Sequence, residues 1–290
     1  MVFVSDLSVP EGPVLLPDGT WLIVEMGPDR GCVTHISADG NEKRVVAKTG
    51  RPNGLAVGGD GTIWVAESKT PSLLKMTLDG EAEVFLDVCD GETFLFPNDL
   101  AFGPDGALYM TDSGTLIDEW APGGTLRPDY AEVVTDGRVY RVDTESGEIQ
   151  KLDSGLQFTN GITFDAHKNL YVNESLTGMV HRYAWGEDGL TGDREEFGNV
   201  VDPDAPDGLN GPDGMKFGLD GKLYVTVFGQ GDVTVLDESG TVTDRLKTEG
   251  NFPTNLVFGP PGSQKIYVTE DQFGTLEVFD VGTDGLELYG

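Results

Sequence analysis

The chain has 290 residues, with 50 acidic and 19 basic side chains and a formal charge of −31. A charge of this sign repels phosphate backbones and anionic lipid, so we expect neither a nucleic acid nor a membrane as a partner. The 41 glycines and 16 prolines stand as scattered turn residues between short apolar runs, which indicates a β-rich chain with many short strands.

The opening segment MVFVSDLSVPEG has neither a basic n-region nor an apolar core, so we expect no signal peptide and a cytoplasmic protein. Its first part, MVFVSDLSV, has the pattern of a strand that precedes the first repeat described below. Cys32 and Cys89 lack the spacing of a zinc site or a disulfide framework, and we expect both to be reduced and buried.

Six segments along the chain share one pattern: a polar residue, a short apolar strand, a turn such as Pro-Asp-Gly, and a second strand that usually ends in an acid. The polar residue that opens each repeat, called the anchor below, is in turn Glu11, Asn53, Asn98, Asn160, Asp213 and Asn255. The anchors are 42, 45, 62, 53 and 42 positions apart, which leaves room for four short strands per repeat. The repeats therefore predict an all-β, six-bladed β-propeller of four-stranded antiparallel blades, in a single domain of residues 1–290.

Two further positions of the repeat fix its geometry. The eighth residue after the anchor closes a hairpin turn that needs a positive φ, and it is Gly19, Gly61, Gly106, Lys168, Gly221 or, one residue later, Gln264. The fourteenth residue ends the second strand, so we expect it at the same end of the propeller as the anchor; it is Glu25, Glu67, Asp112, Glu174, Val227 or, with the same shift, Glu270. We also expect the N-terminal strand to complete the last blade beside residues 276–279.

The long separation between the third and fourth anchors comes from an insertion at residues 113–137. It should emerge on the anchor side, and we expect it to form a lid with Gly123 and Gly124 as flexible points. Trp120, Arg127 and Tyr130 are its candidate substrate contacts. A decorative loop or an oligomer contact is the alternative.

Six innermost strands that meet on one axis bring the anchors into a ring of oxygen donors, with two carboxylates, Glu11 and Asp213, and four carboxamides. Hard divalent cations prefer such ligands, while three histidines and two cysteines in the whole chain argue against a soft metal. Asparagine also starts strands by making local turn hydrogen bonds, and we expect this of Asn53 and Asn255. A glutamate does not form such turns, and a buried carboxylate without a partner is costly. Glu11 and Asp213 on one axis therefore predict a central metal site.

The motifs EGP at 11–13, FPNDLAFGPDG at 96–106, FTNGITF at 158–164 and GPDGM at 211–215 resemble the SMP-30/gluconolactonase family, and the resemblance spans nearly the whole chain. It implies a six-bladed propeller that uses one divalent cation, usually calcium or zinc, to hydrolyse sugar lactones or, in relatives, organophosphate esters. It also implies metal ligands at Glu11, Asn160 and Asp213, with Asn98 as a fourth ligand or a substrate contact. Mammalian members carry an arginine where this chain has Phe96, so we expect Phe96 to contact a smaller or less polar lactone.

Together these observations predict a divalent-metal-dependent lactonase, a gluconolactonase-like carboxylic ester hydrolase. Ca²⁺ is the expected cation, with Zn²⁺, Mn²⁺ or Mg²⁺ as alternatives. The cation polarises the lactone carbonyl, and Asp213 is the candidate base, although the sequence hardly separates it from Glu11 and leaves a nucleophilic role open.

Two other functions remain open from the sequence, a phosphotriester hydrolase on the same metal site and a non-catalytic calcium-binding propeller. For the lactonase we expect a small-molecule lactone as partner, and a monomer or weak homo-oligomer.

Overall fold

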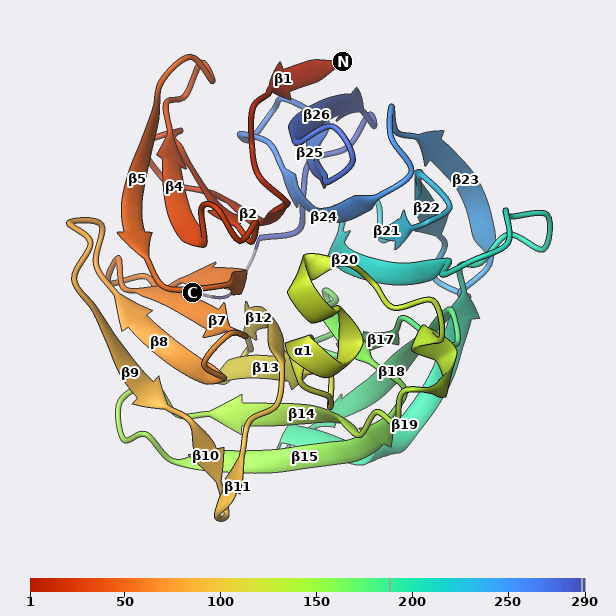
Figure 1. Cartoon of the computed structure of the whole chain (residues 1–290). Coiled ribbons are helices and arrows are strands. Elements are labelled where there is room, and N and C mark those ends of the chain that lie inside the picture. Colours follow the sequence, from red (N-terminus) through yellow and green to blue (C-terminus); the bar gives the residue numbers. More distant parts are fainter. Residues whose placement is uncertain (188, 288, 290) are drawn as a thin grey trace.

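The computed structural model describes residues 1–187, 189–287 and 289. Six four-stranded antiparallel sheets surround a common centre, so the predicted six-bladed propeller is confirmed (Figure 1). From the innermost strand outwards, the first three blades are β2 (Pro10–Leu15), β3 (Trp21–Glu25), β4 (Cys32–Ile36) and β5 (Lys43–Lys48); β6 (Pro52–Val57), β7 (Ile63–Glu67), β8 (Ser72–Met76) and β9 (Ala82–Leu86); and β12 (Pro97–Phe102), β13 (Leu108–Asp112), β14 (Gly137–Val142) and β15 (Ile149–Leu156).

The remaining blades follow the same order. They are β16 (Thr159–Phe164), β17 (Leu170–Glu174), β18 (Met179–Gly186) and β19 (Gly189–Asn199); β20 (Gly211–Phe217), β21 (Leu223–Phe228), β22 (Asp232–Leu236) and β23 (Val242–Lys247); and β24 (Pro253–Phe258), β25 (Lys265–Glu270), β26 (Thr275–Asp280) and β1 (Val2–Val4). A small hairpin, β10 (Val88–Cys89) with β11 (Glu92–Thr93), precedes the third blade.

The N-terminal strand closes the ring, as predicted. β1 pairs antiparallel with β26, and Val2 lies opposite Glu277 while Val4 lies opposite Leu276. Val4 is buried, so this seam adds apolar contact as well as backbone hydrogen bonds.

The core lies between the blades. The second strands are buried along their whole length in the first four blades, because each is covered by a neighbouring blade on either face. One core cluster joins Leu22 and Val24 of the first blade to Leu55 and Val65 of the second, and similar clusters join the later blades.

The predictions for the turns and for the cysteines are also confirmed. The six predicted turn residues all have positive φ, from 54° at Gln264 to 84° at Gly19. Lys168 adopts 71° without being glycine, because the hairpin geometry requires it. Cys32 and Cys89 are free and buried, as expected.

The insertion at 113–137 contains α1 (Ile117–Trp120) and two 3₁₀ helices, η1 (Pro122–Gly124) and η2 (Tyr130–Glu132). Its two ends meet, since the Asp136 N–H donates to the Gly114 carbonyl at 2.9 Å. In Figure 1, α1 lies in front of the centre of the ring. None of the helices in the described residues is long and apolar enough to cross a membrane.

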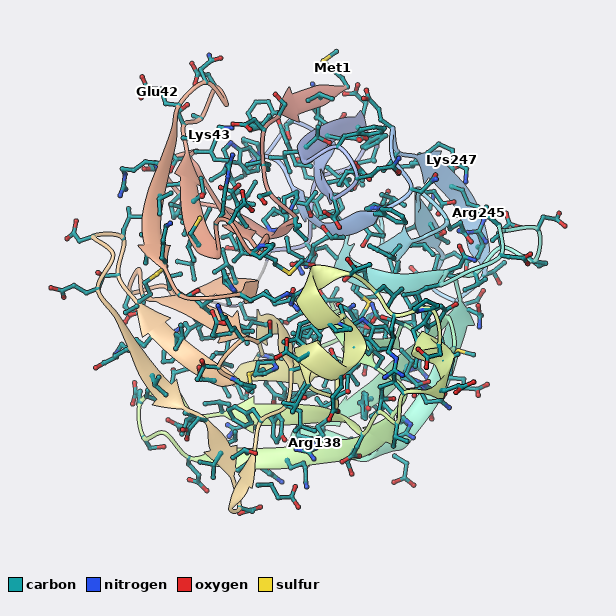
Figure 2. The ribbon with its side chains drawn as sticks, viewed as in Figure 1. Met1, Glu42, Lys43, Arg138, Arg245 and Lys247 are labelled. Atoms are coloured by element: carbon teal, nitrogen blue, oxygen red, sulfur yellow. The ribbon has the colours of Figure 1, made fainter. Side chains whose placement is uncertain are left out.

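The basic side chains labelled in Figure 2 form ion pairs. Lys43 pairs with Asp6 at 3.4 Å, Arg138 with Asp136 at 3.1 Å, and Lys247 with Asp232 at 3.0 Å. The acids outnumber these cations, so most of the negative charge remains for solvent or for a bound cation.

Candidate active site

Every anchor lies at an irregularity of its blade. The residue before the anchor pairs with the fourteenth residue after it or, in the sixth blade, with the fifteenth, in the pairs Pro10–Glu25, Pro52–Glu67, Pro97–Asp112, Thr159–Glu174, Pro212–Val227 and Pro253–Glu270. The ladder then loses its register at or directly after each anchor. Anchors and strand ends therefore share one end of the propeller, as predicted, and the irregularity re-aims the anchor side chain.

The innermost strands approach one another too closely for a side chain at the position after some anchors. A Cβ added at Gly12, where φ is 52°, would lie 2.7 Å from the Asn53 carbonyl oxygen, and one at Gly161 would lie 2.3 Å from that of Asp213. Glycine is needed at such approaches. The blades therefore converge tightly enough for anchors of different blades to share one axial space.

Two acids of this space carry raised pKa values. Glu11 is 2 % exposed, and burial together with the charges of Asp213 and Asp99 raises its pKa well above the usual range. Asp213 is partly exposed, and burial together with the charge of Asp99 likewise raises its pKa, against an opposing effect of the Asn160 amide. Three acids from different blades thus repel one another at the axis, which favours a bound cation.

Hydrogen bonds to serines orient two carboxamides of the ring. Asn98 Nδ2 donates to Ser113 Oγ at 2.9 Å, and Asn160 Nδ2 donates to Ser175 Oγ at 3.2 Å. Each serine hydroxyl gives its own proton to a backbone carbonyl of the next blade, so it can only accept from the amide. The amide oxygen of Asn160 therefore points away from Ser175, and it is buried without a hydrogen-bond partner among the described residues.

The sixth and second ring positions behave differently from these two. Asn255 makes the expected local bond, since its Oδ1 accepts from the Leu256 N–H at 2.8 Å, and its Nδ2 also donates to Glu11 Oε2 at 3.2 Å. Among the described residues no backbone N–H donates to the Asn53 side chain in this way, so the local turn bond expected of Asn53 is not found.

This donor set fits a hard divalent cation. Two carboxylates and the free amide oxygen of Asn160 are ligands of the kind that Ca²⁺ takes, with Asn98 beside them. Within the described ranges, no three side chains of His, Cys, Asp or Glu form a group that could hold a metal on their own. A cation at the axis would therefore need the amide oxygens as well as the carboxylates.

The acids that end the second strands have a structural role. They are Glu25, Glu67, Asp112, Glu174 and Glu270, which accept the backbone N–H groups of Ser8, Arg51, Phe96, Gln157 and Phe252 at 2.8–3.1 Å. Each acid thereby holds the segment that enters the innermost strand two or three residues before the anchor. The anchors are positioned by these bonds.

The predicted lid residues divide into two groups. Trp120 packs against Phe158 with tilted rings whose centroids are 4.2 Å apart, Phe158 meets Phe96 edge-on at 5.7 Å, and Tyr130 meets Trp120 at 6.1 Å. These four rings, called the aromatic roof below, lie at the anchor end, because Phe96 and Phe158 come two residues before anchors. Arg127 is not brought to them: its guanidinium makes two 2.6 Å bonds with Asp129, and it is exposed.

Two residues of the axial space were not predicted from the sequence. Asp99 follows its anchor where four of the other five repeats have glycine, Gly12, Gly54, Gly161 and Gly214, and this exception was the available signal. Arg51 lies with its guanidinium carbon 5.2 Å from the centre of the Phe96 ring. Burial lowers the pKa of Arg51 to about 10, although the charge of Glu67 opposes the shift. No repeat pattern marks Arg51.

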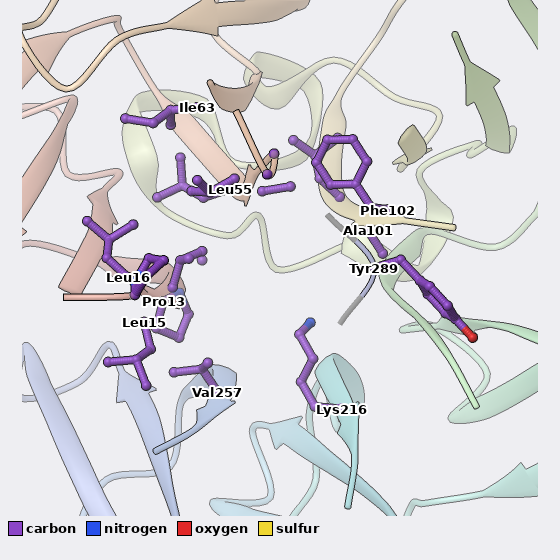
Figure 3. A pocket seen from close by; sticks show the side chains of 18 of the residues that line it. Pro13, Leu15, Leu16, Leu55, Ile63, Ala101, Phe102, Lys216, Val257 and Tyr289 are labelled. Atoms are coloured by element: carbon purple, nitrogen blue, oxygen red, sulfur yellow. The ribbon is translucent and has the colours of Figure 1, made fainter. Parts of the chain in front are cut away.

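The opposite end of the axis is apolar. A cavity of about 520 Å³ opens there among turn residues and is lined by Leu15, Leu55, Phe102 and Val257, with the Lys216 amine pointing into it (Figure 3). Asp99 also reaches its wall. Because the convergent polar groups lie at the anchor end, we place the candidate active site there.

The fold and the site together define a class of protein. It is a six-bladed propeller with two anchor carboxylates and oriented carboxamides at its axis. The chain belongs to the SMP-30/gluconolactonase/LRE-like region family, whose sequence profile matches residues 5–272. The resemblance seen in the four motifs is thus confirmed.

Individual proteins are also similar to the chain over most of its length. The chain is 28% identical over 289 residues to a gluconolactonase of Zymomonas mobilis, covering 92% of this chain and 78% of that protein. It is 27% identical over 273 residues to pentonolactonase XacC of Haloferax volcanii, covering 89% and 80%. Among solved structures, the calcium-binding protein regucalcin of Agrobacterium tumefaciens has the same fold, with a TM-score of 0.78, 19% identity and coverage of 100% and 98%.

Proposed function

We propose that this protein is a lactonase that opens a small sugar lactone with the help of one divalent cation, Ca²⁺ first. Glu11, Asn160 and Asp213 would hold the cation, with Asn98 as the fourth ligand or a substrate contact. The relatives named gluconolactonase and pentonolactonase support the reaction and the substrate class. They favour neither a phosphotriester hydrolase nor a propeller without chemistry.

One observation carries the metal assignment. The buried oxygen of Asn160 has no hydrogen-bond partner among the described residues, and it belongs to the same axial space as two acids whose pKa values are raised. An unpaired buried acceptor beside repelling carboxylates is costly unless a cation satisfies all three. When bound, a divalent cation supplies polarisation of the lactone carbonyl and stabilises negative charge on its oxygen.

The proposed roles of the chain's own residues follow from burial. Asp213 is partly exposed, so it can meet a water molecule as the base, and it takes a proton from the water whose oxygen bonds to the carbonyl carbon. The ring C–O bond then breaks, and the ring oxygen leaves as a hydroxyl with that proton. Glu11 is fully enclosed and bonded to Asn255, which suits a fixed ligand. The hydroxy acid formed ionises at neutral pH and releases one proton.

The proton released when the hydroxy acid ionises allows ring opening to be measured. A pH indicator is used with aldonolactones and simple γ- and δ-lactones, first after chelation and then with added Ca²⁺, Zn²⁺, Mn²⁺ or Mg²⁺. We expect ring opening that falls on chelation and returns with one of the cations. Failure to open any lactone of the panel with any of the four cations contradicts the proposal.

The base is tested by Asp213→Asn, which keeps the shape of the side chain and removes the proton acceptor. We expect turnover to fall by about 10²-fold or more, the range of general-base catalysis, with an unchanged circular dichroism spectrum. Asp280→Asn is the matched control, because Asp280 is exposed at the outer end of β26. Near-normal turnover of Asp213→Asn excludes Asp213 as the base.

A further inference from the structure

Arg51 differs from most arginines of this acidic chain. Arg30, Arg141 and Arg194, for example, form ion pairs at 2.7 Å. Arg51 forms no salt bridge with a carboxylate of the described residues, and its single side-chain hydrogen bond within them is from Nη1 to Ser68 Oγ at 2.9 Å. Its Nε and Nη2 groups therefore remain available as donors.

The Arg51 residue is nevertheless held firmly. Its backbone N–H donates to Glu67 Oε1 at 2.8 Å, and its carbonyl accepts from the Ser68 N–H at 3.0 Å and the Ser68 hydroxyl at 2.9 Å. The guanidinium lies over the Phe96 ring, which is 3 % exposed and belongs to the aromatic roof. Backbone and side chain are thus positioned before any ligand binds, which lowers the entropy cost of binding.

The contacts of this guanidinium and the charges near it place it at the anchor end. Arg51 enters the second blade, and the ring beneath its guanidinium belongs to the third. The charges of Glu11 of the first blade, Asp213 of the fifth and Asp271, directly after β25 of the sixth, act on it. The guanidinium therefore lies beside Phe96 at the anchor end, within electrostatic range of these acids. It therefore faces the same space as the anchors.

We propose that Arg51 is a specificity-determining residue that binds oxygen atoms of the lactone through its free N–H donors, an inference that rests on the proposed lactonase function. The planar fork of donors matches neighbouring hydroxyl oxygens, and the Phe96 ring packs against the guanidinium. The surrounding acids oppose a bound anion, so the ligand is a neutral, polyhydroxylated lactone. Phe96 is then the platform of a polar contact, and this revises the expectation of a less polar substrate.

The test compares two substrates with the same six-membered ring, glucono-δ-lactone with hydroxyls and δ-valerolactone without them. For Arg51→Met we expect kcat/KM on the hydroxylated lactone to fall on the order of 10- to 100-fold, mainly through KM, because donors to substrate oxygens are lost. The value for δ-valerolactone should change by less than about threefold, because it offers no hydroxyls to these donors. Arg51→Lys should lie between, since it keeps the charge and loses the fork.

Controls separate the proposal from a structural role. Arg44→Met removes an exposed arginine of β5 and should leave both values unchanged. Phe96→Leu keeps Arg51 but removes its platform, so it should cause a smaller loss that is again confined to the hydroxylated lactone, and it replaces Arg51→Met if that variant does not fold. An equal loss on both substrates overturns the proposal. A wild-type protein that opens neither lactone overturns the lactonase function itself, which is a separate outcome.

Discussion

Glu11 and Glu174 are both buried glutamates, yet their surroundings move their pKa values in opposite directions. Burial raises the pKa in both. Glu174 then receives hydrogen bonds from His181 at 3.0 Å, from the Gln157 N–H at 2.8 Å and from the Thr177 hydroxyl at 2.8 Å, and these lower its pKa to about 2. Glu11 instead faces other acids. Hydrogen bonds within the fold stabilise the ionised Glu174, whereas Glu11 lies beside repelling acids and is available to a ligand.

The lowered pKa of Glu174 predicts how the substitution Glu174→Gln changes the stability of the fold. The folded pKa lies below the ordinary value of 4.5, so the ionised form stabilises the fold above about pH 4.5 and this stability is lost as the pH falls towards 2. We expect the variant to lose about 2–3 kcal/mol of unfolding free energy at pH 7, with a smaller difference from wild type below pH 4.5. Urea unfolding at several pH values measures this. The exposed Glu145→Gln should show no loss, and a pH-independent difference for Glu174→Gln would contradict the explanation by hydrogen bonds to the ionised carboxylate.

At the scale of the elements, the insertion at 113–137 is a closed loop. The Gly114 and Asp136 backbones are bonded at its base, and Trp120 packs its ring on Phe158 beside an anchor. A deletion of residues 116–130 therefore leaves both ends close enough to join and uncovers the anchor end. We expect KM for the lactone to rise several-fold while the thermal transition of the propeller is retained. Unchanged KM and kcat in the deletion variant would show that the insertion does not act as a lid.

The strands and the axial residues were not equally predictable from the sequence. Anchors, turns and second strands repeat six times, so a local pattern gives their place in the ring. Arg51 does not repeat, because its position at the anchor end depends on Phe96 of the next blade and on Ser68. Arg127 failed to join the lid contacts for a local reason, since its Nε and Nη2 donate to Asp129, two residues away. Pairings between blades and short-range ion pairs are decided only in the folded chain.

At the scale of the whole molecule, the proposed ligands come from separate blades. Glu11 belongs to the first blade, Asn160 to the fourth and Asp213 to the fifth, while β1 closes the sixth. A cation held by all three binds only the closed ring, so its binding free energy adds to the stability of the folded state. Chelation should then weaken the ring even where no substrate is present.

This is testable by thermal unfolding without any assay of activity. Saturation at about 100 times the dissociation constant adds about 2.7 kcal/mol, which for a chain of this size raises Tm by roughly 4–5 °C. We expect this rise when Ca²⁺ is added to chelated protein, and none for Glu11→Gln, which keeps the shape of the ligand but halves the carboxylates. Because a charge of −31 is also screened by any salt, NaCl of equal ionic strength is the control. An equal rise with NaCl, or in Glu11→Gln, would assign the effect to general screening and leave the axis without a bound ion.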